Sequence, residues 1–159
     1  MTMGNVLGMV GAALAVFLAC AGSAIGVSRT GQAGAGLLSK NPNKFVDVMI
    51  LQALPATQGL YGFVVAFLAV FVKIKFGANM NHLTYEEGLS MLILCLPVGI
   101  AGFASAVLQG SVAVSGINMI GKQEKQLVKA IVLTAMVELF AIFAFIVSIL
   151  GVLQLGVTA

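Results

Sequence analysis

The sequence predicts an all-α membrane protein with four transmembrane helices, arranged as two duplicated hairpins. Of its 159 residues, 60% are hydrophobic and only 8% are charged, and the mean hydropathy is +1.12. Soluble domains carry about 25% charged residues, so this composition indicates an integral membrane protein. Four apolar stretches each exceed the roughly 20 residues that cross a bilayer. The net charge of +3 is small and lies in the expected loops, which gives no support for nucleic-acid binding.

Hydropathy places the predicted spans at residues 5–38, 46–72, 89–119 and 127–155. They divide the chain into a first hairpin at residues 1–72, a connecting loop at 73–88 and a second hairpin at 89–159. The first span has no basic leader and is too long for a signal peptide, so we expect it to be retained as a span.

Loop charges predict how the helices are oriented. Five lysines cluster near the two hairpin tips, at Lys40, Lys44, Lys122, Lys125 and Lys129. By the positive-inside rule, we expect these tips to face the cytoplasm and both termini to face the other side. Lys73 and Lys75 lie in the connecting loop and count against this orientation.

The two hairpins resemble each other. A shift of about 80 residues places Gly22 on Gly102 and Gly36 on Gly116, which indicates a duplication with both copies in the same membrane orientation. Under a similar shift Glu138 falls opposite Gly59, so one copy carries a carboxylate where the other has none.

Small and bulky residues separate between the spans. The first and third spans carry small residues three or four apart, at Gly4, Gly8, Gly11, Ala15, Ala19, Gly22, Gly26, Gly99, Gly102, Ala106, Gly110, Ala113 and Gly116. The second and fourth spans carry aromatic residues, at Phe63, Phe67, Phe71, Phe140, Phe143 and Phe145. Small residues let membrane helices approach closely. The pattern predicts thin inner helices wrapped by bulky outer helices that face lipid; an ordinary four-helix bundle is the alternative.

The fourth span holds one ionisable residue, Glu138, far from its basic end. A helix rising about 1.5 Å per residue places Glu138 roughly 16 Å from the end near Lys129, close to mid-membrane. A charge at that depth costs roughly 2.5–3.5 kcal/mol on insertion scales, so it indicates an ion or proton site. The alternative is a protonated or paired carboxyl that only holds helices together.

Polar residues on two other spans lie at a similar depth. Leu54, Thr57, Gln58 and Tyr61 share one face of the second span, and Gln109 lies midway along the third. Pro55 removes a backbone N–H and frees carbonyl oxygens nearby. The oxygens of this set, with the Glu138 carboxylate, suit a hard monovalent cation, and Tyr61 can hold the carboxylate in place. Alternatively, the glutamines and the threonine only hydrogen-bond one another between helices.

Other polar residues receive structural interpretations. We expect Ser105 and Ser111 to bond within their own helix and Thr84 to cap the third span. Arg29 is either a counter-charge to Glu138 or a residue that extends toward the cytoplasmic surface, and we favour the second interpretation. Cys20 and Cys95 lie in apolar runs and His82 lies in a loop, so no transition-metal site or cofactor is expected. Gly121-Lys122-Gln123 lacks the remainder of a phosphate-binding loop, so the chain is expected to bind no nucleotide and to be no enzyme by itself.

Three segments carry a resemblance to a known family. Leu54-Pro55-Ala56-Thr57-Gln58-Gly59-Leu60-Tyr61, Gln109-Gly110 and Met136-Val137-Glu138 resemble the proteolipid subunit of V-type rotary ATPases, and most closely subunit K of the bacterial sodium-pumping enzymes. The resemblance implies a homo-oligomeric rotor ring in which each chain carries one transported Na⁺. It implies Na⁺ ligands at Leu54, Thr57, Gln58, Gln109 and Glu138, with Tyr61 bonding the carboxylate.

The resemblance also implies partners and a location. The partners are identical protomers in the ring, a stator membrane subunit with an arginine, a central-stalk subunit at the cytoplasmic loops, and lipid. The location is the cell membrane, as a multi-pass protein, with the bacterial plasma membrane favoured.

Three alternatives stay open at this point. The first keeps the family but makes Glu138 a proton carrier. The second is a small four-helix cation antiporter with one essential glutamate, although such antiporters usually use aromatic cages and this chain has no Trp. The third is a structural or pore-forming protein without a transport cycle.

Overall fold

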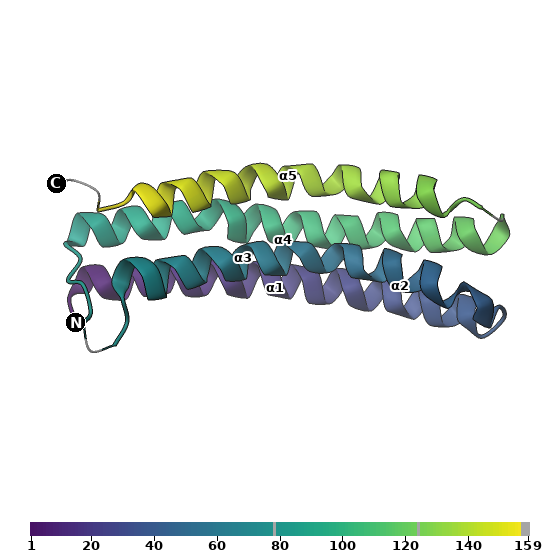
Figure 1. Ribbon diagram of the computed structural model, residues 1–159, viewed down its shortest axis with the longest axis horizontal. Helices are drawn as coiled ribbons and strands as arrows, with labels where there is room; N and C mark the ends of the chain where they lie inside the picture. Colours follow the sequence, from purple (N-terminus) through teal and green to yellow (C-terminus); the bar gives the residue numbers. More distant parts are fainter. Residues whose placement is uncertain (78, 124, 157–159) are drawn as a thin grey trace.

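Four long helices lie side by side in the computed structural model, which describes residues 1–77, 79–123 and 125–156 (Figure 1). Each is long and apolar enough to cross a membrane; they extend over Met3–Leu38, Pro42–Ile74, Tyr85–Lys122 and Leu127–Gln154. All regular structure in the described residues is helical, which confirms the predicted all-α class with four spans. The predicted end of the second hairpin, at 157–159, lies outside the described residues.

The second span is a series of segments rather than one regular helix. The elements are α1 (Met3–Leu38), a 3₁₀ turn (Pro42–Lys44), α2 (Phe45–Ala53), a second 3₁₀ turn (Leu54–Ala56), α3 (Thr57–Phe67), a π-helical segment (Leu68–Ile74), α4 (Tyr85–Lys122) and α5 (Leu127–Gln154). The beginning of α1, the end of α5 and the loop after Ile74 lie at one end, called the terminal end below (Figure 1). The two hairpin turns lie at the other, called the tip end (Figure 1).

Side-chain caps fix where α1 and α4 begin. The Thr2 Oγ1 accepts a hydrogen bond from the Asn5 N–H at 3.2 Å. Thr84 and Glu87 form a capping box, in which the Thr84 N–H donates to the Glu87 carboxylate at 2.7 Å and the Glu87 N–H donates to Thr84 Oγ1 at 3.2 Å. The predicted cap at Thr84 is therefore confirmed, and α4 begins at Tyr85, before the apolar run itself.

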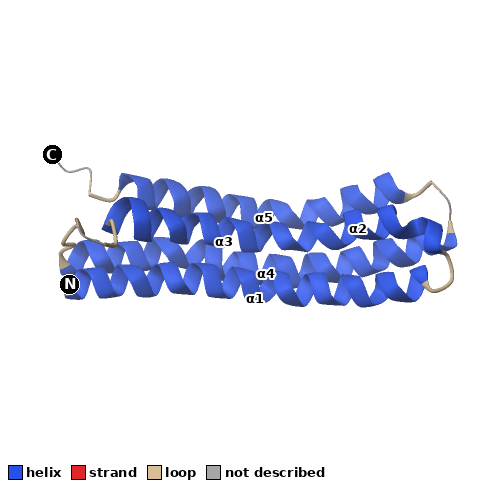
Figure 2. Cartoon of the chain, turned by 60° about the horizontal axis from the view of Figure 1, so that its bottom comes forward, coloured by secondary structure: helices blue, strands red, loops and turns tan. Residues whose placement is uncertain are grey.

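The two small-residue stripes face each other between α1 and α4. Figure 2 shows these two helices in one layer, with α3 and α5 in the other. Every residue of the predicted stripes is buried. The approach is backbone to backbone: a Cβ added to Gly110 would lie 2.5 Å from the Cα of Gly26, and one added to Gly11 would lie 2.6 Å from the Cα of Leu92. The predicted packing of thin helices is confirmed.

Alanine substitutions in α1 will separate packing from helix propensity. A Cβ at Gly22 would lie 2.6 Å from the Cα of Phe103, whereas a Cβ at Gly36 would meet nothing within 4 Å. We expect Gly22→Ala to destabilise the purified protein by about 1–3 kcal/mol, because the two backbones must separate. Gly36→Ala should be neutral or stabilising by up to about 1 kcal/mol. Denaturation in detergent measures both, and equal effects would contradict this packing.

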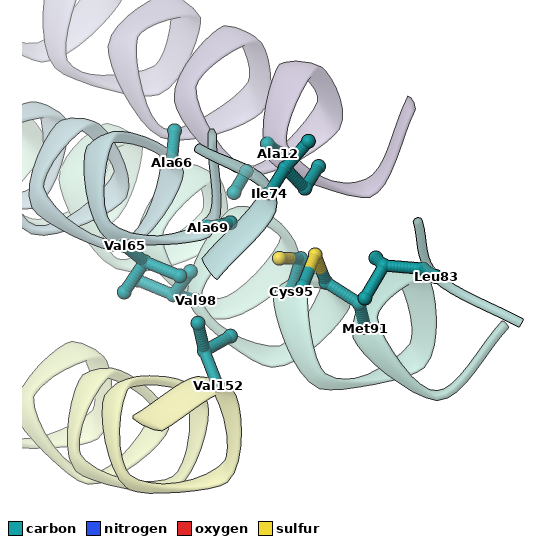
Figure 3. Close-up of a cluster of buried hydrophobic side chains, with 11 residues drawn as sticks. Ala12, Val65, Ala66, Ala69, Ile74, Leu83, Met91, Cys95, Val98 and Val152 are labelled. Atoms are coloured by element: carbon teal, nitrogen blue, oxygen red, sulfur yellow. The ribbon is translucent and has the colours of Figure 1, made fainter. Parts of the chain in front are cut away.

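A hydrophobic cluster packs the terminal half of the molecule (Figure 3). Val65, Ile74, Met91, Cys95 and Val152 are fully buried there and come from the second span, α4 and α5. Cys95 is a free thiol within this cluster, in agreement with its interpretation as a small hydrophobic residue. This apolar packing fixes how the second span lies against α4 and α5 on one side of the polar residues described below.

Most of the bulky aromatic residues lie on the outer surface. Phe63, Phe67, Phe71, Phe140 and Phe143 are exposed, as expected for a lipid-facing layer. Phe145 differs from these five in being only partly exposed. Its ring stacks on Tyr61 with the centroids 4.9 Å apart, so it supports the tyrosine from within the outer layer.

The terminal-end loop is tied to the helices by polar contacts. The Asn5 side chain is fully buried; it accepts from the Leu83 N–H at 2.8 Å and donates to the Asn81 carbonyl at 2.9 Å. Lys73 donates from Nζ to the backbone carbonyls of Leu153 and Leu155, at the carboxyl end of α5. A cation is favoured at that end of a helix. Lys73 counted against the predicted orientation, but its charge stabilises the carboxyl end of α5.

Candidate ion-binding site

The site begins where the second span departs from α-helical geometry. Pro55 is buried and supplies no N–H, and the backbone forms a 3₁₀ turn over Leu54–Ala56. The Leu54 carbonyl accepts the Thr57 N–H and lies 3.0 Å from the Thr57 hydroxyl. The turn therefore gathers a carbonyl and a hydroxyl oxygen on one side of the helix. The Thr57 hydroxyl also lies 3.4 Å from Gln58 Oε1, which adds an amide oxygen to this group.

Glu138 on α5 meets a donor at each carboxylate oxygen. The Tyr61 hydroxyl donates to Oε1 at 2.5 Å, and Gln109 Nε2 donates to Oε2 at 3.5 Å. Tyr61 comes from α3 and Gln109 from α4, so the carboxylate joins three helices. The Phe145 ring stacks on the tyrosine ring and so restricts its position. The carboxylate is half-buried, in contrast with the fully buried glutamines.

The two glutamines are fully buried and contact each other. Gln58 Nε2 donates to Gln109 Oε1 at 2.6 Å, and Gln109 Nε2 donates to the Thr134 carbonyl at 3.2 Å. The structure thus brings all six predicted residues into one connected polar network: Leu54, Thr57, Gln58, Tyr61, Gln109 and Glu138. That these residues bind an ion remains a prediction.

The sequence interpretation missed three groups of this network, namely the Ser105 hydroxyl and the backbone carbonyls of Val137 and Thr134. Ser105 was expected to bond within its own helix, and this is wrong: its hydroxyl donates to the Val137 carbonyl of α5 at 3.0 Å and accepts from Gln58 Nε2 at 3.3 Å. Ser111 does bond within its helix, to the Val107 carbonyl at 3.3 Å. Only the spacing of Ser105 one turn before Gln109, on the same face of α4, hinted at its role.

The donor set favours a hard cation of low charge. It combines a carboxylate, two amide oxygens, a hydroxyl and a backbone carbonyl, and hard cations take oxygen ligands. One carboxylate balances one positive charge, which matters because an unpaired buried charge is costly. In the described part of the chain, no three His, Cys, Asp or Glu residues come together in the way that transition-metal sites require.

Arg29 lies away from this network. Its side chain is exposed on α1 and lines a shallow surface pocket with Gln32, Ala33, Ser111 and Val114. The ion pair formed within the described residues is that of Lys44 with Asp47, at 3.1 Å. Arg29 is therefore no counter-charge to Glu138, and its extension toward the cytoplasmic surface stays a prediction.

Comparison with known proteins places the chain in a family. The model of the ATP synthase C-subunit family matches it twice, over residues 10–69 and 92–151, once in each hairpin. The chain therefore belongs to the ATP synthase C-subunit family, and the predicted duplication is confirmed. The match also agrees with the resemblance inferred from the residues around Gln58, Gln109 and Glu138.

Individual relatives refine this placement. The chain is 42% identical to the V-type sodium ATPase subunit K of Enterococcus hirae over 151 residues, which cover 95% of this chain and 93% of that relative. It is 40% identical to the A-type ATP synthase subunit K of Methanocaldococcus jannaschii over 91% of this chain but only 61% of that relative. It is 26% identical to the c' subunit of the V-type proton ATPase of Candida glabrata, over 90% of this chain and 85% of that relative.

Proposed function

We propose that this chain is the ion-carrying subunit of the rotor ring in a V-type rotary ATPase, and that each copy carries one Na⁺ at Glu138. The observation that carries the proposal is the polar network at one level of three helices, with its single carboxylate held by Tyr61 and Gln109. Family membership and the 42% identity to a sodium ATPase subunit support it. The family also argues against the small-antiporter alternative.

The proposed ligands are Leu54, Thr57, Gln58, Gln109 and Glu138, and Tyr61 orients the carboxylate. The carbonyl, hydroxyl and amide oxygens replace the water around the ion, and the carboxylate balances its charge. A loaded site is then neutral overall, so Glu138 can pass through lipid as the ring turns. The half-buried position of Glu138 on the outer layer suits this passage, because an ion can reach it from the ring's outer surface.

Rotation supplies the work of transport. Identical protomers form the ring, with α1 and α4 toward its centre and α3 and α5 toward lipid. A central-stalk subunit binds the tip-end loops on the cytoplasmic side and turns the ring, while a soluble head hydrolyses ATP. At the stator subunit an arginine attracts the Glu138 carboxylate and releases the ion. Moving one charge against 100 mV takes about 2.3 kcal/mol, so one ATP can drive several ions. We place this ring in the bacterial plasma membrane.

The test is the rate at which a carboxyl-modifying carbodiimide labels Glu138 in the purified ring, across pH and sodium concentration. The reagent needs a protonated acid, so a bound Na⁺ should block labelling. We expect millimolar sodium to protect Glu138, more strongly at higher pH. Labelling that depends on pH but does not change with sodium would instead establish the proton-carrying alternative. Two less similar relatives are named as subunits of proton ATPases.

Removing the tyrosine hydroxyl will weaken the site without destroying it. Hydrogen bonds to charged groups are worth about 1.5–3 kcal/mol, so we expect Tyr61→Phe to raise the half-protecting sodium concentration at least roughly tenfold. Tyr85, exposed at the start of α4, provides the matched control, and Tyr85→Phe should behave like the wild type. Equal sodium protection in all three proteins would show that the Tyr61 contact does not support the carboxylate.

A further inference from the structure

Ser105 lies between the second span and α5 at the level of the proposed ion. Its side chain is on α4 and is only 4% exposed. The hydroxyl contacts Gln58 Nε2 at 3.3 Å on one side and the Val137 carbonyl at 3.0 Å on the other. Ser105 is not one of the five proposed ligands, and its hydroxyl contacts the Nε2 atom of Gln58 rather than the oxygens of Leu54 and Thr57.

The chemistry of these groups fixes the direction of the hydrogen bonds. A serine hydroxyl has one hydrogen, and a backbone carbonyl can only accept. The Val137 carbonyl therefore takes the hydrogen of Ser105, and the oxygen of Ser105 must accept from Gln58. Only the N–H₂ side of the Gln58 amide can face it, so the Gln58 oxygen must point the other way, toward Thr57 Oγ1 at 3.4 Å.

The same direction extends to the second glutamine. Gln58 gives its other hydrogen to Gln109 Oε1, so Gln109 turns its own N–H₂ group to the Thr134 carbonyl and to Glu138. All four amide hydrogens are then used within the network, and the Gln58 oxygen stays with the group of oxygens. A reversed Gln58 amide would present hydrogens to a cation, which repel it.

We propose that Ser105 is a positioning residue that sets sodium affinity by holding the Gln58 amide with its oxygen toward the ion. This inference rests on the proposed function and gives a role in it to a residue that is not a ligand and does not touch the ion. Without the hydroxyl, one buried N–H of Gln58 has no partner and the amide loses the contact that fixes its direction.

The experiment compares Ser105→Ala with Ser148→Ala in the carbodiimide assay on the purified, assembled ring. Ser148 is a matched control because it is fully buried, also joins α5 to α4 by accepting from the Val98 N–H at 3.1 Å, and lies outside the polar network. Ser105→Cys is a second variant of nearly unchanged size whose thiol is a weak hydrogen-bonding group. Helix content and ring assembly are checked for each protein.

We expect Ser105→Ala to raise the half-protecting sodium concentration roughly tenfold, with Ser105→Cys in between. Glu138 should still label without sodium, since the Tyr61 hydroxyl holds the carboxylate independently of Ser105. Ser148→Ala should leave sodium protection unchanged. An unchanged half-protecting concentration in Ser105→Ala, or an equal rise in Ser148→Ala, would overturn the positioning role. Absence of sodium protection in the wild type would instead refute the sodium function, and the role of Ser105 in it.

Discussion

Replacing Glu138 by glutamine will abolish ATP-driven sodium uptake when the assembled enzyme is reconstituted in vesicles. The glutamine keeps the size and one oxygen acceptor of the side chain but cannot balance the charge of the ion. A buried, unpaired cation costs several kcal/mol, more than the remaining neutral oxygens recover. Uptake should therefore fall to the background of vesicles without ATP.

The matched control is Glu86→Gln. Glu86 is exposed in the first turn of α4, at the terminal end of the molecule, so the substitution removes an identical charge far from the site. Its uptake should equal that of the wild type. Each variant must first be shown to form the intact ring in detergent. Continued uptake by Glu138→Gln, in a ring that has assembled, would contradict the role given to this carboxylate.

Replacing Gln109 by leucine should have the second largest effect, a loss of sodium affinity of roughly a hundredfold. Leucine nearly fills the space but has no polar atoms. The change removes one proposed ligand oxygen and the donor to Glu138 Oε2, and it leaves Gln58 Nε2 without its closest acceptor. Several buried polar groups lose partners together, which explains the larger effect than that of Tyr61→Phe.

Sodium titration of carbodiimide labelling measures this loss. Gln32→Leu serves as the control, because Gln32 is exposed on α1 and bonds only to the Ser28 hydroxyl among the described residues. We also expect a change in ion dependence: labelling of Gln109→Leu should follow pH with little response to sodium. A half-protecting sodium concentration equal to that of Gln32→Leu would remove Gln109 from the site.

Hydropathy and helical rise were sufficient to predict much of this structure. Counting along apolar runs located four spans and placed Gln58, Gln109 and Glu138 at one depth, and the structure joins them in one network. The glycine and alanine stripes were equally informative, since close helix packing demands small residues wherever two backbones meet. These features depend on periodicity and length, which a single sequence displays directly.

Other features depend on which neighbour a side chain meets. Ser105 has the same local alternatives as Ser111, yet it bonds to α5, because α5 packs directly against its face of α4. Phe145 stacks on Tyr61 and is only partly exposed, whereas Phe140 and Phe143 are exposed. Lys73 donates to the carbonyl of Leu153 at the carboxyl end of α5, although the two residues are 80 positions apart in the sequence. No local pattern distinguishes these outcomes.

Equilibrium binding of radioactive sodium to the purified ring tests the central claim most directly. We predict saturable binding of one Na⁺ per chain, lost in Glu138→Gln and retained in Glu86→Gln. Raising the proton concentration should displace the ion, since both compete for the same carboxylate. The absence of saturable binding in the wild type, or binding of the same stoichiometry in Glu138→Gln, would contradict the proposal that Glu138 carries sodium.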